Sequence, residues 1–257
     1  MKELKGKTVF ITGATSGIGK SAAYKFAELG SNLILTARRK ERLEEIAKDL
    51  ISEYSVKVIT IEMDVRNYDD VKSGIDSLSG EWSNISILIN NAGLARGLSR
   101  IHEGSVQDWN EMIDTNVKGL LFVSKCVIPL MLKNNTGHVI NIGSIAGREV
   151  YPMGNVYCAT KHAVDAITKS MRMELIESGI RVTTIDPGLV ETEFSLVRYR
   201  GDSEKAKSAY RGLEPLTPDN IAETIIFAAT RDENFVIAEM VLLPKSQANT
   251  MVIKRDV

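Results

Sequence analysis

The chain is poor in the features that mark disulfide-rich, membrane-bound or nucleic-acid-binding proteins. It has two cysteines in 257 residues, Cys126 and Cys158, each inside an apolar helical pattern, which favours free thiols in a reducing compartment. Its 33 acidic residues balance its 32 Lys and Arg, so no basic excess predicts a nucleic-acid surface. We expect no membrane span, because no apolar run approaches the roughly 20 residues needed. The polar stretch Met1 to Lys7 argues against a signal peptide, so we expect a cytoplasmic protein.

The chain does contain a regular alternation of strand-like and helical patterns. Seven short, β-branched runs read like strands buried on both faces of a parallel sheet. They are Thr8–Thr12, Asn32–Ala37, Lys57–Glu62, Ile85–Asn90, Gly137–Ile142, Arg181–Asp186 and Phe235–Leu243. The helical patterns are Gly17–Leu29, Lys40–Tyr54, Asp69–Leu78, Val106–Lys133, Val156–Ser178 and Pro218–Thr230. This order predicts an α/β protein, with a single-domain, doubly wound, seven-stranded parallel sheet over residues 1–257 and helices on both faces.

Two segments stand outside this alternation. The irregular stretch from Pro187 to Thr217 is too long for an ordinary connection, so we predict a substrate lid at about residues 188–217. The tail, residues 244–257, has the apolar run Met251-Val252-Ile253 among polar residues. It either reaches a neighbouring subunit or is frayed.

A glycine-rich turn follows the first predicted strand and opens a helix. Its members are Gly13, Ala14, Thr15, Ser16, Gly17, Ile18 and Gly19. Backbone N–H groups and the helix dipole converge at such a turn and favour a bound pyrophosphate. A P-loop is an alternative, suggested by Gly19-Lys20-Ser21, but Ala14 replaces its first glycine. The second alternative is a turn with a purely structural role and no bound ligand.

The second predicted strand ends in Arg38-Arg39, where a site for NAD would carry an acid to hold the ribose 2′-hydroxyl. Two guanidinium groups suit a 2′-phosphate instead, because each offers a rigid fork of donors. We therefore predict NADP(H) rather than NAD(H). The alternative is that both arginines open a solvated helix.

Tyr157 and Lys161 stand four residues apart, and Ser144 lies thirteen residues before the tyrosine. On a helix this spacing of four places the phenol and the ammonium on one face. Two unit charges roughly 5 Å apart at an effective dielectric of about 20 interact by about 3 kcal/mol, or roughly two pKa units. Lys161 would thus bring the phenol into a useful range for proton transfer. Taken alone, such a pair is usually an exposed accident.

Further motifs cover nearly the whole chain and together resemble the short-chain dehydrogenase/reductase family. They are Thr12-Gly13-x-x-x-Gly17-x-Gly19, Asp64-Val65, Asn90-Asn91-Ala92-Gly93, Asn116, Ser144, Tyr157-x-x-x-Lys161, and Pro187-Gly188 followed by Thr192. Chance agreement at so many ordered positions is negligible. Without the resemblance, the Asn90–Gly93 run would suit a tight turn, and Asn116 a polar position on a helix surface.

The resemblance implies four catalytic residues. Tyr157 would be the general acid in carbonyl reduction and the general base in alcohol oxidation. Lys161 would lower the pKa of this phenol and bind the nicotinamide ribose, and Ser144 would donate to the developing alkoxide. Asn116 would open a kink in its helix and hold a water that passes protons toward Lys161.

The resemblance also implies how the cofactor is bound. Asp64 would meet the adenine amine and Val65 its face, while Asn91 would meet the adenine-side ribose. Ala92 and Gly93 would let the backbone approach closely. The nicotinamide carboxamide would be covered by the run Pro187-Gly188-Leu189-Val190 and hydrogen-bonded by Thr192. We expect no metal ligand.

The lid sequence narrows the substrate class. The run from Glu193 to Asp202 resembles the branch of NADP-dependent 3-hydroxy acid dehydrogenases that oxidise serine and allo-threonine. A substrate carboxylate would suit a guanidinium, and the candidates are Arg148, Arg198 and Arg200. The main alternative is a reductase of other ketones or 3-oxoacyl groups, and a lesser one is a non-catalytic NADP(H)-binding regulator. The two long helices carry more apolar surface than packing on the sheet should need, which suggests subunit contacts. The resemblance implies a homotetramer, because members of the family commonly form tetramers.

Overall fold

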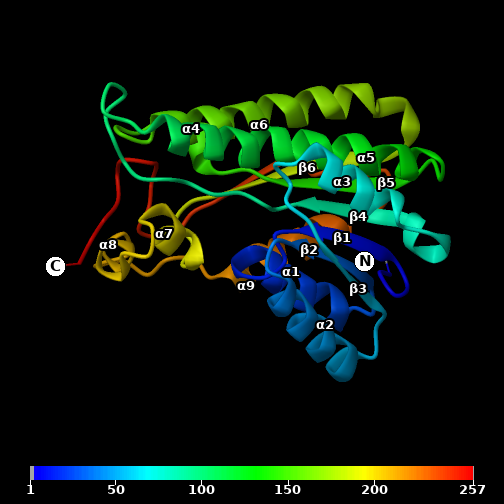
Figure 1. Ribbon diagram of the computed structural model, residues 1–257. Helices are drawn as coiled ribbons and strands as arrows, with labels where there is room; N and C mark the ends of the chain where they lie inside the picture. Colours follow the sequence, from blue (N-terminus) through cyan, green and yellow to red (C-terminus); the bar gives the residue numbers. More distant parts are fainter. Residues whose placement is uncertain (1–2, 257) are drawn as a thin grey trace.

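One parallel sheet organises the computed structural model, which describes residues 3–256 (Figure 1). Its strand order is β3-β2-β1-β4-β5-β6-β7, and every neighbouring pair is parallel. The strands are β1 (Thr8–Thr12), β2 (Asn32–Ala37), β3 (Val58–Glu62), β4 (Ile85–Asn90), β5 (Gly137–Ile142), β6 (Ile180–Pro187) and β7 (Glu239–Leu242). The predicted doubly wound fold is confirmed. The order reverses between β1 and β4, and ligands of such sheets bind beyond the carboxyl ends at this point.

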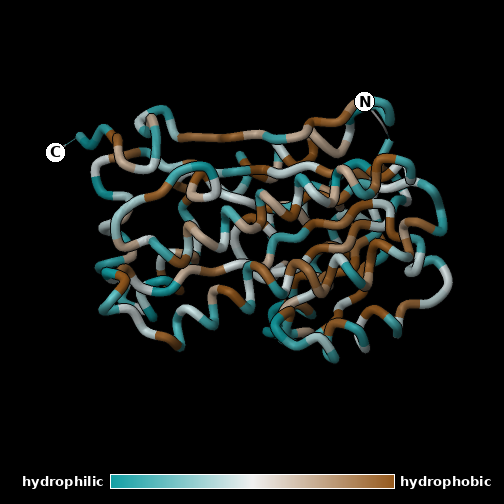
Figure 2. The backbone as a smooth tube through the Cα atoms, turned by 90° about the horizontal axis from the view of Figure 1, so that it is seen from above, coloured by the Kyte–Doolittle hydropathy of each residue, from teal (hydrophilic) through white to brown (hydrophobic). Residues whose placement is uncertain are grey.

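Helices cover both faces of the sheet (Figure 1). They are α1 (Gly17–Glu28), α2 (Lys40–Tyr54), α3 (Tyr68–Asp76), α4 (Val106–Ile113), α5 (Leu120–Leu132), α6 (Asn155–Glu174), α7 (Glu193–Arg198), α8 (Ser203–Ser208) and α9 (Pro218–Ala229). Helices α1, α2 and α9 pack on one face, and α3, α5 and α6 on the other, so that two apolar cores sandwich the sheet. Hydrophobic stretches accordingly run along the strands inside the molecule, while the outer turns are mostly hydrophilic (Figure 2).

Three predicted elements differ from the structure. The strand predicted over Phe235–Leu243 is only β7, because this edge strand pairs solely with β6 over four positions. The helix predicted over Val106–Lys133 is interrupted by a π-helical turn at Asp114–Gly119, which separates α4 from α5. The helix predicted over Val156–Ser178 ends at Glu174 and continues as a 3₁₀ turn.

The same interrupted helix is the one described stretch that meets the length and composition criteria for a membrane span. The stretch Val106–Leu132 is long and apolar enough to cross a membrane by those two criteria alone. Core helices of soluble proteins satisfy the same criteria, and 44% of its most apolar window is buried inside this structure. Leu120, Val123 and Val127 of α5 belong to one of the two apolar cores, which explains the composition without a membrane.

The predicted lid contains two short helices, α7 and α8, and the tail packs against it. Gln247 accepts a hydrogen bond from the Leu189 backbone N–H at 2.9 Å. Farther along, the Asp256 N–H donates to the Gly212 carbonyl at 2.7 Å. The described part of the tail is therefore tied down at both ends, which rules out the frayed alternative for it.

The glycine turn between β1 and α1 is held against the end of β4. Gly13 has φ +67°, in the left-handed region that favours glycine. The Asn91 amide donates to the carbonyls of Thr12 and Gly13 at 2.9 and 3.2 Å. A Cβ on Gly19 would lie 2.5 Å from the Gly13 oxygen, so no larger residue fits there without moving the turn.

Gly19→Ala should therefore lower the free energy of unfolding by about 1–3 kcal/mol, as overpacking in a tight site does. Chemical denaturation monitored by circular dichroism measures this. The neighbouring control Lys20→Ala changes an exposed helix position and should stay within about 0.5 kcal/mol of wild type. Equal stability of the two variants would contradict the tight packing at Gly19.

Candidate active site

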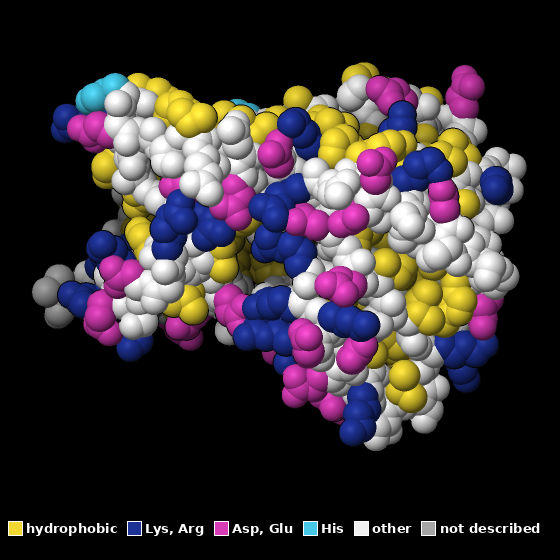
Figure 3. Space-filling view, viewed as in Figure 1, with side chains coloured by type: hydrophobic (Ala, Val, Ile, Leu, Met, Phe, Trp, Pro, Cys, Tyr) yellow, Lys and Arg dark blue, Asp and Glu magenta, His cyan; other side chains and the backbone are white. Residues whose placement is uncertain are grey.

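A cavity of about 430 Å³ opens over the carboxyl ends of the central strands. It runs from the glycine turn, past the ends of β4 and β5, to the lid and the tail. The molecule is visibly hollowed between the lid and the main body, with Lys, Arg, Asp and Glu side chains around the opening (Figure 3). An elongated ligand with anionic groups suits this shape and charge.

Most of the predicted site residues line this one cavity. From the cofactor set these are Gly13, Thr15, Ser16, Gly17, Ile18, Arg38, Arg39, Asp64, Val65, Asn91, Ala92, Gly93, Pro187, Gly188, Val190 and Thr192. From the catalytic and substrate sets they are Ser144, Tyr157, Lys161 and Arg198. Gly19, Asn116, Arg148 and Arg200 are not among the described residues that line it. Residues scattered over most of the sequence thus share one site.

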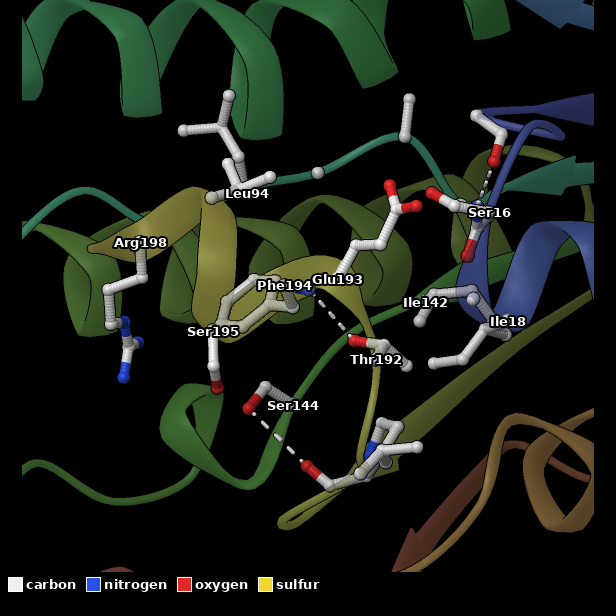
Figure 4. A pocket seen from close by; sticks show the side chains of 18 of the residues that line it. Ser16, Ile18, Leu94, Ile142, Ser144, Thr192, Glu193, Phe194, Ser195 and Arg198 are labelled. Atoms are coloured by element: carbon white, nitrogen blue, oxygen red, sulfur yellow. Dashed lines mark hydrogen bonds between the residues drawn. The ribbon is translucent and has the colours of Figure 1, made fainter. Parts of the chain in front are cut away.

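The two ends of the cavity differ in character. Ser16 and Ile18 of the glycine turn lie at one end, and Phe194, Ser195 and Arg198 of α7 at the other (Figure 4). At the first end, Arg39 donates to the Thr15 hydroxyl at 2.8 Å and to the Ser16 hydroxyl at 3.0 Å. A cation beside bare backbone N–H groups makes this end suited to phosphate.

Two residues expected to contact the cofactor are already engaged by the protein. The carboxylate of Asp64 accepts hydrogen bonds from Arg66 Nη2 at 2.6 Å and from its backbone N–H at 3.0 Å. The side chain of Asn91 braces the glycine turn, as described above. Both still line the cavity, so contacts to an adenosine group remain predictions for them.

Asn116 lies in the π-helical turn that interrupts its helix between α4 and α5. Its side chain is buried, accepts from the Leu94 N–H at 2.8 Å, and donates to the Leu94 carbonyl at 2.8 Å and to the Thr160 hydroxyl at 3.0 Å. It thereby ties the segment after β4 to α6, the helix that carries Tyr157. The water relay to Lys161 remains a prediction.

Tyr157 is held in an aromatic corner of the cavity. Phe194 meets its ring edge-on at 5.6 Å between centroids, and Ser144 lines the same cavity. Burial raises the pKa of Tyr157 above its ordinary value. The guanidinium of Arg198, 5.1 Å from the ring centre, opposes this increase. A lid arginine thus favours the charged form of this phenol, and the expected effect of Lys161 on the phenol pKa remains a prediction.

The side chain of Lys161 reaches from α6 to the end of β5, and its expected contact with the nicotinamide ribose remains a prediction. Its side chain is buried and its ammonium donates to the Ile142 carbonyl at the end of β5 at 2.9 Å. Burial lowers the pKa of Lys161 to about 8, against the opposing charge of Asp186. A spacing of four residues places two side chains on one helix face, but it does not decide where a flexible lysine reaches.

The structure gives no support to Arg148 or Arg200 as partners of a substrate carboxylate. Arg148 donates to Asp186 at 2.6 Å and to Glu239 at 2.5 Å. Arg200 forms an ion pair with Asp108 near the surface. Acidic residues of β6, β7 and α4 therefore already pair with these two guanidinium groups. The positions of the two arginines in the sequence gave no sign of these acidic partners, because the acids are far away along the chain.

Sequence patterns missed several residues that line the cavity. They are Tyr151, Glu193, Phe194, Tyr210, Gln247, Thr250 and Ile253. They come from the loop before α6, from the lid and from the tail, where neither periodicity nor a motif sets them apart. Only the way the tail folds back over the lid brings the last three to the site.

Comparison with known proteins agrees with this geometry. A family model described as short chain dehydrogenase matches residues 7–200. The chain belongs to this family. An NADP-dependent 3-hydroxy acid dehydrogenase of Schizosaccharomyces pombe is 47% identical over 256 residues, covering 99% of each chain. NADP-dependent 3-hydroxy acid dehydrogenase YdfG of Escherichia coli (strain K12) is 42% identical over 93% of this chain and 96% of its own.

A solved structure gives the same picture in three dimensions. The closed form of serine dehydrogenase complexed with NADP⁺ superposes with a TM-score of 0.90 and 40% identity, covering 97% of this chain and all of its own. The predicted family and fold are thus confirmed, and the protein is an oxidoreductase of the short-chain dehydrogenase family.

The burial of Lys161 leads to a pH-dependent stability. In the folded state its pKa is about 8, against 10.5 ordinarily, so between these values the unfolded chain binds more protons. The free energy of unfolding of the wild type, relative to Lys161→Met, should rise by about 2 kcal/mol from about pH 8 to about pH 10. Urea titrations at several pH values measure this difference.

The matched control is Lys169→Met, which removes an exposed lysine from the same helix. Its stability relative to wild type should lack this rise, because Lys169 pairs with Asp165 and its pKa is raised, not lowered. A flat difference between wild type and Lys161→Met would show that Lys161 is not desolvated.

Proposed function

We propose that this protein is an NADP(H)-dependent dehydrogenase that oxidises the 3-hydroxyl of small 3-hydroxy acids such as serine, allo-threonine and 3-hydroxypropionate. The observation that carries the substrate class is the guanidinium of Arg198, which stands over the ring of the catalytic tyrosine at 5.1 Å. The relatives named as NADP-dependent 3-hydroxy acid dehydrogenases support both cofactor and substrate class.

The residues at the first end of the cavity fit the cofactor. Ser16, the residue that precedes α1, and its neighbours present backbone N–H groups, and Arg38 and Arg39 supply positive charge. The close packing at Gly19 and Gly13 leaves no room for side chains that would fill this space. The cofactor, when bound, accepts the hydride from the substrate carbon. The 2′-phosphate of NADP(H) suits the two arginines, whereas NAD(H) offers them no anion at that place.

The chain itself moves the proton. In oxidation, the phenolate of Tyr157 takes the proton of the substrate hydroxyl, while Ser144 hydrogen-bonds the same oxygen. Because burial raises the pKa of Tyr157, its neutral form prevails at neutral pH, and this form donates the proton in the reverse reduction. Oxidation is therefore expected to speed up as the pH increases, since more phenolate is then present. Lys161 holds its ammonium at the end of β5, beside this pair.

Arg198 has donor capacity left for an anionic substrate. Its Nη2 donates to the Tyr151 hydroxyl at 3.0 Å, and its buried Nε has no hydrogen-bond partner among residues 3–256. A buried donor without a partner is costly, and a carboxylate would satisfy it. In a 3-hydroxy acid the hydroxyl-bearing carbon is two bonds from the carboxyl carbon, and Arg198 and Tyr157, which line the same cavity, would meet the carboxylate and the hydroxyl respectively.

The main alternative is reduction of other ketones or 3-oxoacyl groups. One relative, sulfoacetaldehyde reductase 2 of Chromohalobacter salexigens, is 41% identical over 96% of this chain and 98% of its own. Its name describes a small anionic carbonyl compound, which an arginine would also accommodate. A non-catalytic regulator is less well supported, because Asn116, Ser144, Tyr157 and Lys161 are all present.

The test measures initial rates with NADP⁺ or NAD⁺ against L-serine, D-serine, L-allo-threonine, 3-hydroxypropionate, 3-hydroxybutyrate and uncharged secondary alcohols. NADP⁺-dependent oxidation confined to the carboxylated compounds is expected. Arg198→Ala should raise KM for these acids by about 10- to 100-fold, because one partner of a charged pair is lost. The matched control Arg200→Ala removes a lid arginine paired with Asp108 and should change KM less than about threefold.

Tyr157→Phe tests the proposed proton transfer. This variant should lose nearly all turnover but still bind NADP(H), because only the phenol hydroxyl is removed. Equal KM effects of Arg198→Ala on acids and uncharged alcohols would contradict the carboxylate role. Oxidation of none of the acids, together with reduction of sulfoacetaldehyde or 3-oxoacyl thioesters by NADPH, would establish the alternative.

We also propose a homotetramer in the cytosol. Two separate faces expose large apolar side chains, as two kinds of dimer interface would require. The first face carries Val106, Ile113, Leu121 and Leu132 of α4 and α5, and the second carries Phe227, Phe235, Val236 and Val241 near β7. The free thiols Cys126 and Cys158 suit a reducing compartment.

Light scattering after size exclusion should therefore give the mass of four chains. Val241→Lys, on the exposed edge strand, should give dimers, because a charge is placed in one interface only. Lys245→Ala, which lies just beyond β7, is the control and should remain tetrameric. A monomeric wild type would contradict the proposal.

A further inference from the structure

The carboxyl end of α7 is held by the segment that follows β4. Arg96 Nη1 donates to the Val197 carbonyl at 2.6 Å. The neighbouring Gly97 N–H donates to the Arg198 carbonyl at 2.9 Å. Two successive carbonyls of the lid thus receive hydrogen bonds from two successive residues of this segment. Together these bonds hold the backbone from which the Arg198 side chain reaches the ring of Tyr157.

The guanidinium of Arg96 is itself oriented by Glu111 of α4. Its Nε and Nη2 donate to the two carboxylate oxygens at 2.7 and 2.9 Å, a bidentate arrangement that fixes the plane of the guanidinium. Both side chains are only 17% exposed, so salt screens this ion pair weakly. Hydrogen bonds from Arg96 hold the pKa of the Glu111 carboxyl below its usual value, so the pair persists at neutral pH.

Arg96 acts on the lid and leaves the substrate to Arg198. Among the described residues, Arg198 lines the large cavity and Arg96 does not. The segment that carries Arg96 also packs on the lid, because Leu94 belongs to one apolar cluster with Phe194 and Val197. Figure 4 shows Leu94 beside α7, on the helix that carries Arg198. The contacts of the segment therefore converge on this helix.

We propose that Arg96 is a positioning residue for the substrate carboxylate, and that Glu111 holds it in this role. The pair fixes the end of α7 so that the guanidinium of Arg198 stays over the Tyr157 ring, where the carboxylate of a 3-hydroxy acid meets it. Without Arg96, the end of α7 loses its bond at Val197, and the Arg198 side chain no longer starts from a fixed place. This inference rests on the proposed function, since it takes Arg198 as the carboxylate partner.

Arg96→Met tests the proposal, because it keeps an apolar stem and removes the donors. The KM for the hydroxy acid that is oxidised fastest should rise about three- to tenfold, less than in Arg198→Ala, since Arg198 is displaced and not lost. The inhibition constant of propionate, which has the carboxyl group without the hydroxyl, should rise by the same factor. NADP⁺ affinity, measured by isothermal titration, should stay within about twofold of wild type, because this site lies at the other end of the cavity.

The matched control is Arg100→Met, which removes an exposed arginine from the same loop and should change neither the KM nor the inhibition constant. The double variant of Arg96→Met and Arg198→Ala separates positioning from a general loss of structure. It should have the KM of Arg198→Ala alone, because no guanidinium is left to position. A rise caused by Arg96→Met that is equally large in both backgrounds would overturn the inference.

Glu111→Gln keeps the test decisive if Arg96→Met fails to fold. Its neutral amide accepts weaker hydrogen bonds than the carboxylate, so KM should rise by a smaller factor of about two to five. A raised KM in Arg198→Ala, together with an unchanged KM in both Arg96→Met and Glu111→Gln, would overturn the positioning role and leave the proposed function standing. An unchanged KM in Arg198→Ala would instead overturn the carboxylate role, and the positioning role with it.

Discussion

The site depends on the hydrogen bonds that join the carboxyl ends of β1 and β4. The Thr12 hydroxyl accepts from the backbone N–H groups of Asn91 and Ala92 at 3.0 Å, and the Asn91 amide returns two bonds to the glycine turn. These strands flank the point where the sheet order reverses, so the crevice there has its two walls held in register. With the turn fixed, the dinucleotide end and the catalytic end acquire a constant separation.

Desolvation shifts the pKa values of two titratable side chains that line the cavity. Lys161 is desolvated, which lowers its pKa, and Tyr157 is desolvated, which raises its pKa. The guanidinium of Arg198 stands over the Tyr157 ring from the lid, so a lid residue contributes to the electrostatics around this phenol. Because Glu193 begins the same helix, the electrostatics of the cofactor end and of the catalytic end are carried by six consecutive residues.

Much of the fold was predictable because its signals are local. Short apolar runs separated by helical patterns specify a parallel sheet, and six of the seven predicted strands agree with the structure to within one residue at either end. The exception is β7, which pairs along one edge only, so the strand is shorter than the apolar run from Phe235 to Leu243. The π-helical turn at Asn116 also escaped periodicity, since it depends on side-chain bonds to Leu94 and Thr160.

The sequence by itself determined the layered sheet, the glycine turn at one end of the cavity and the helical spacing of Tyr157 and Lys161, because spacing along one helix or turn suffices for these. The tertiary structure alone decided which arginine is available. Arg148 is paired with Asp186 and Glu239, Arg200 with Asp108, and Arg198 remains beside Tyr157. Ion pairs form between residues far apart in the chain, and no local pattern encodes which acid will meet which base.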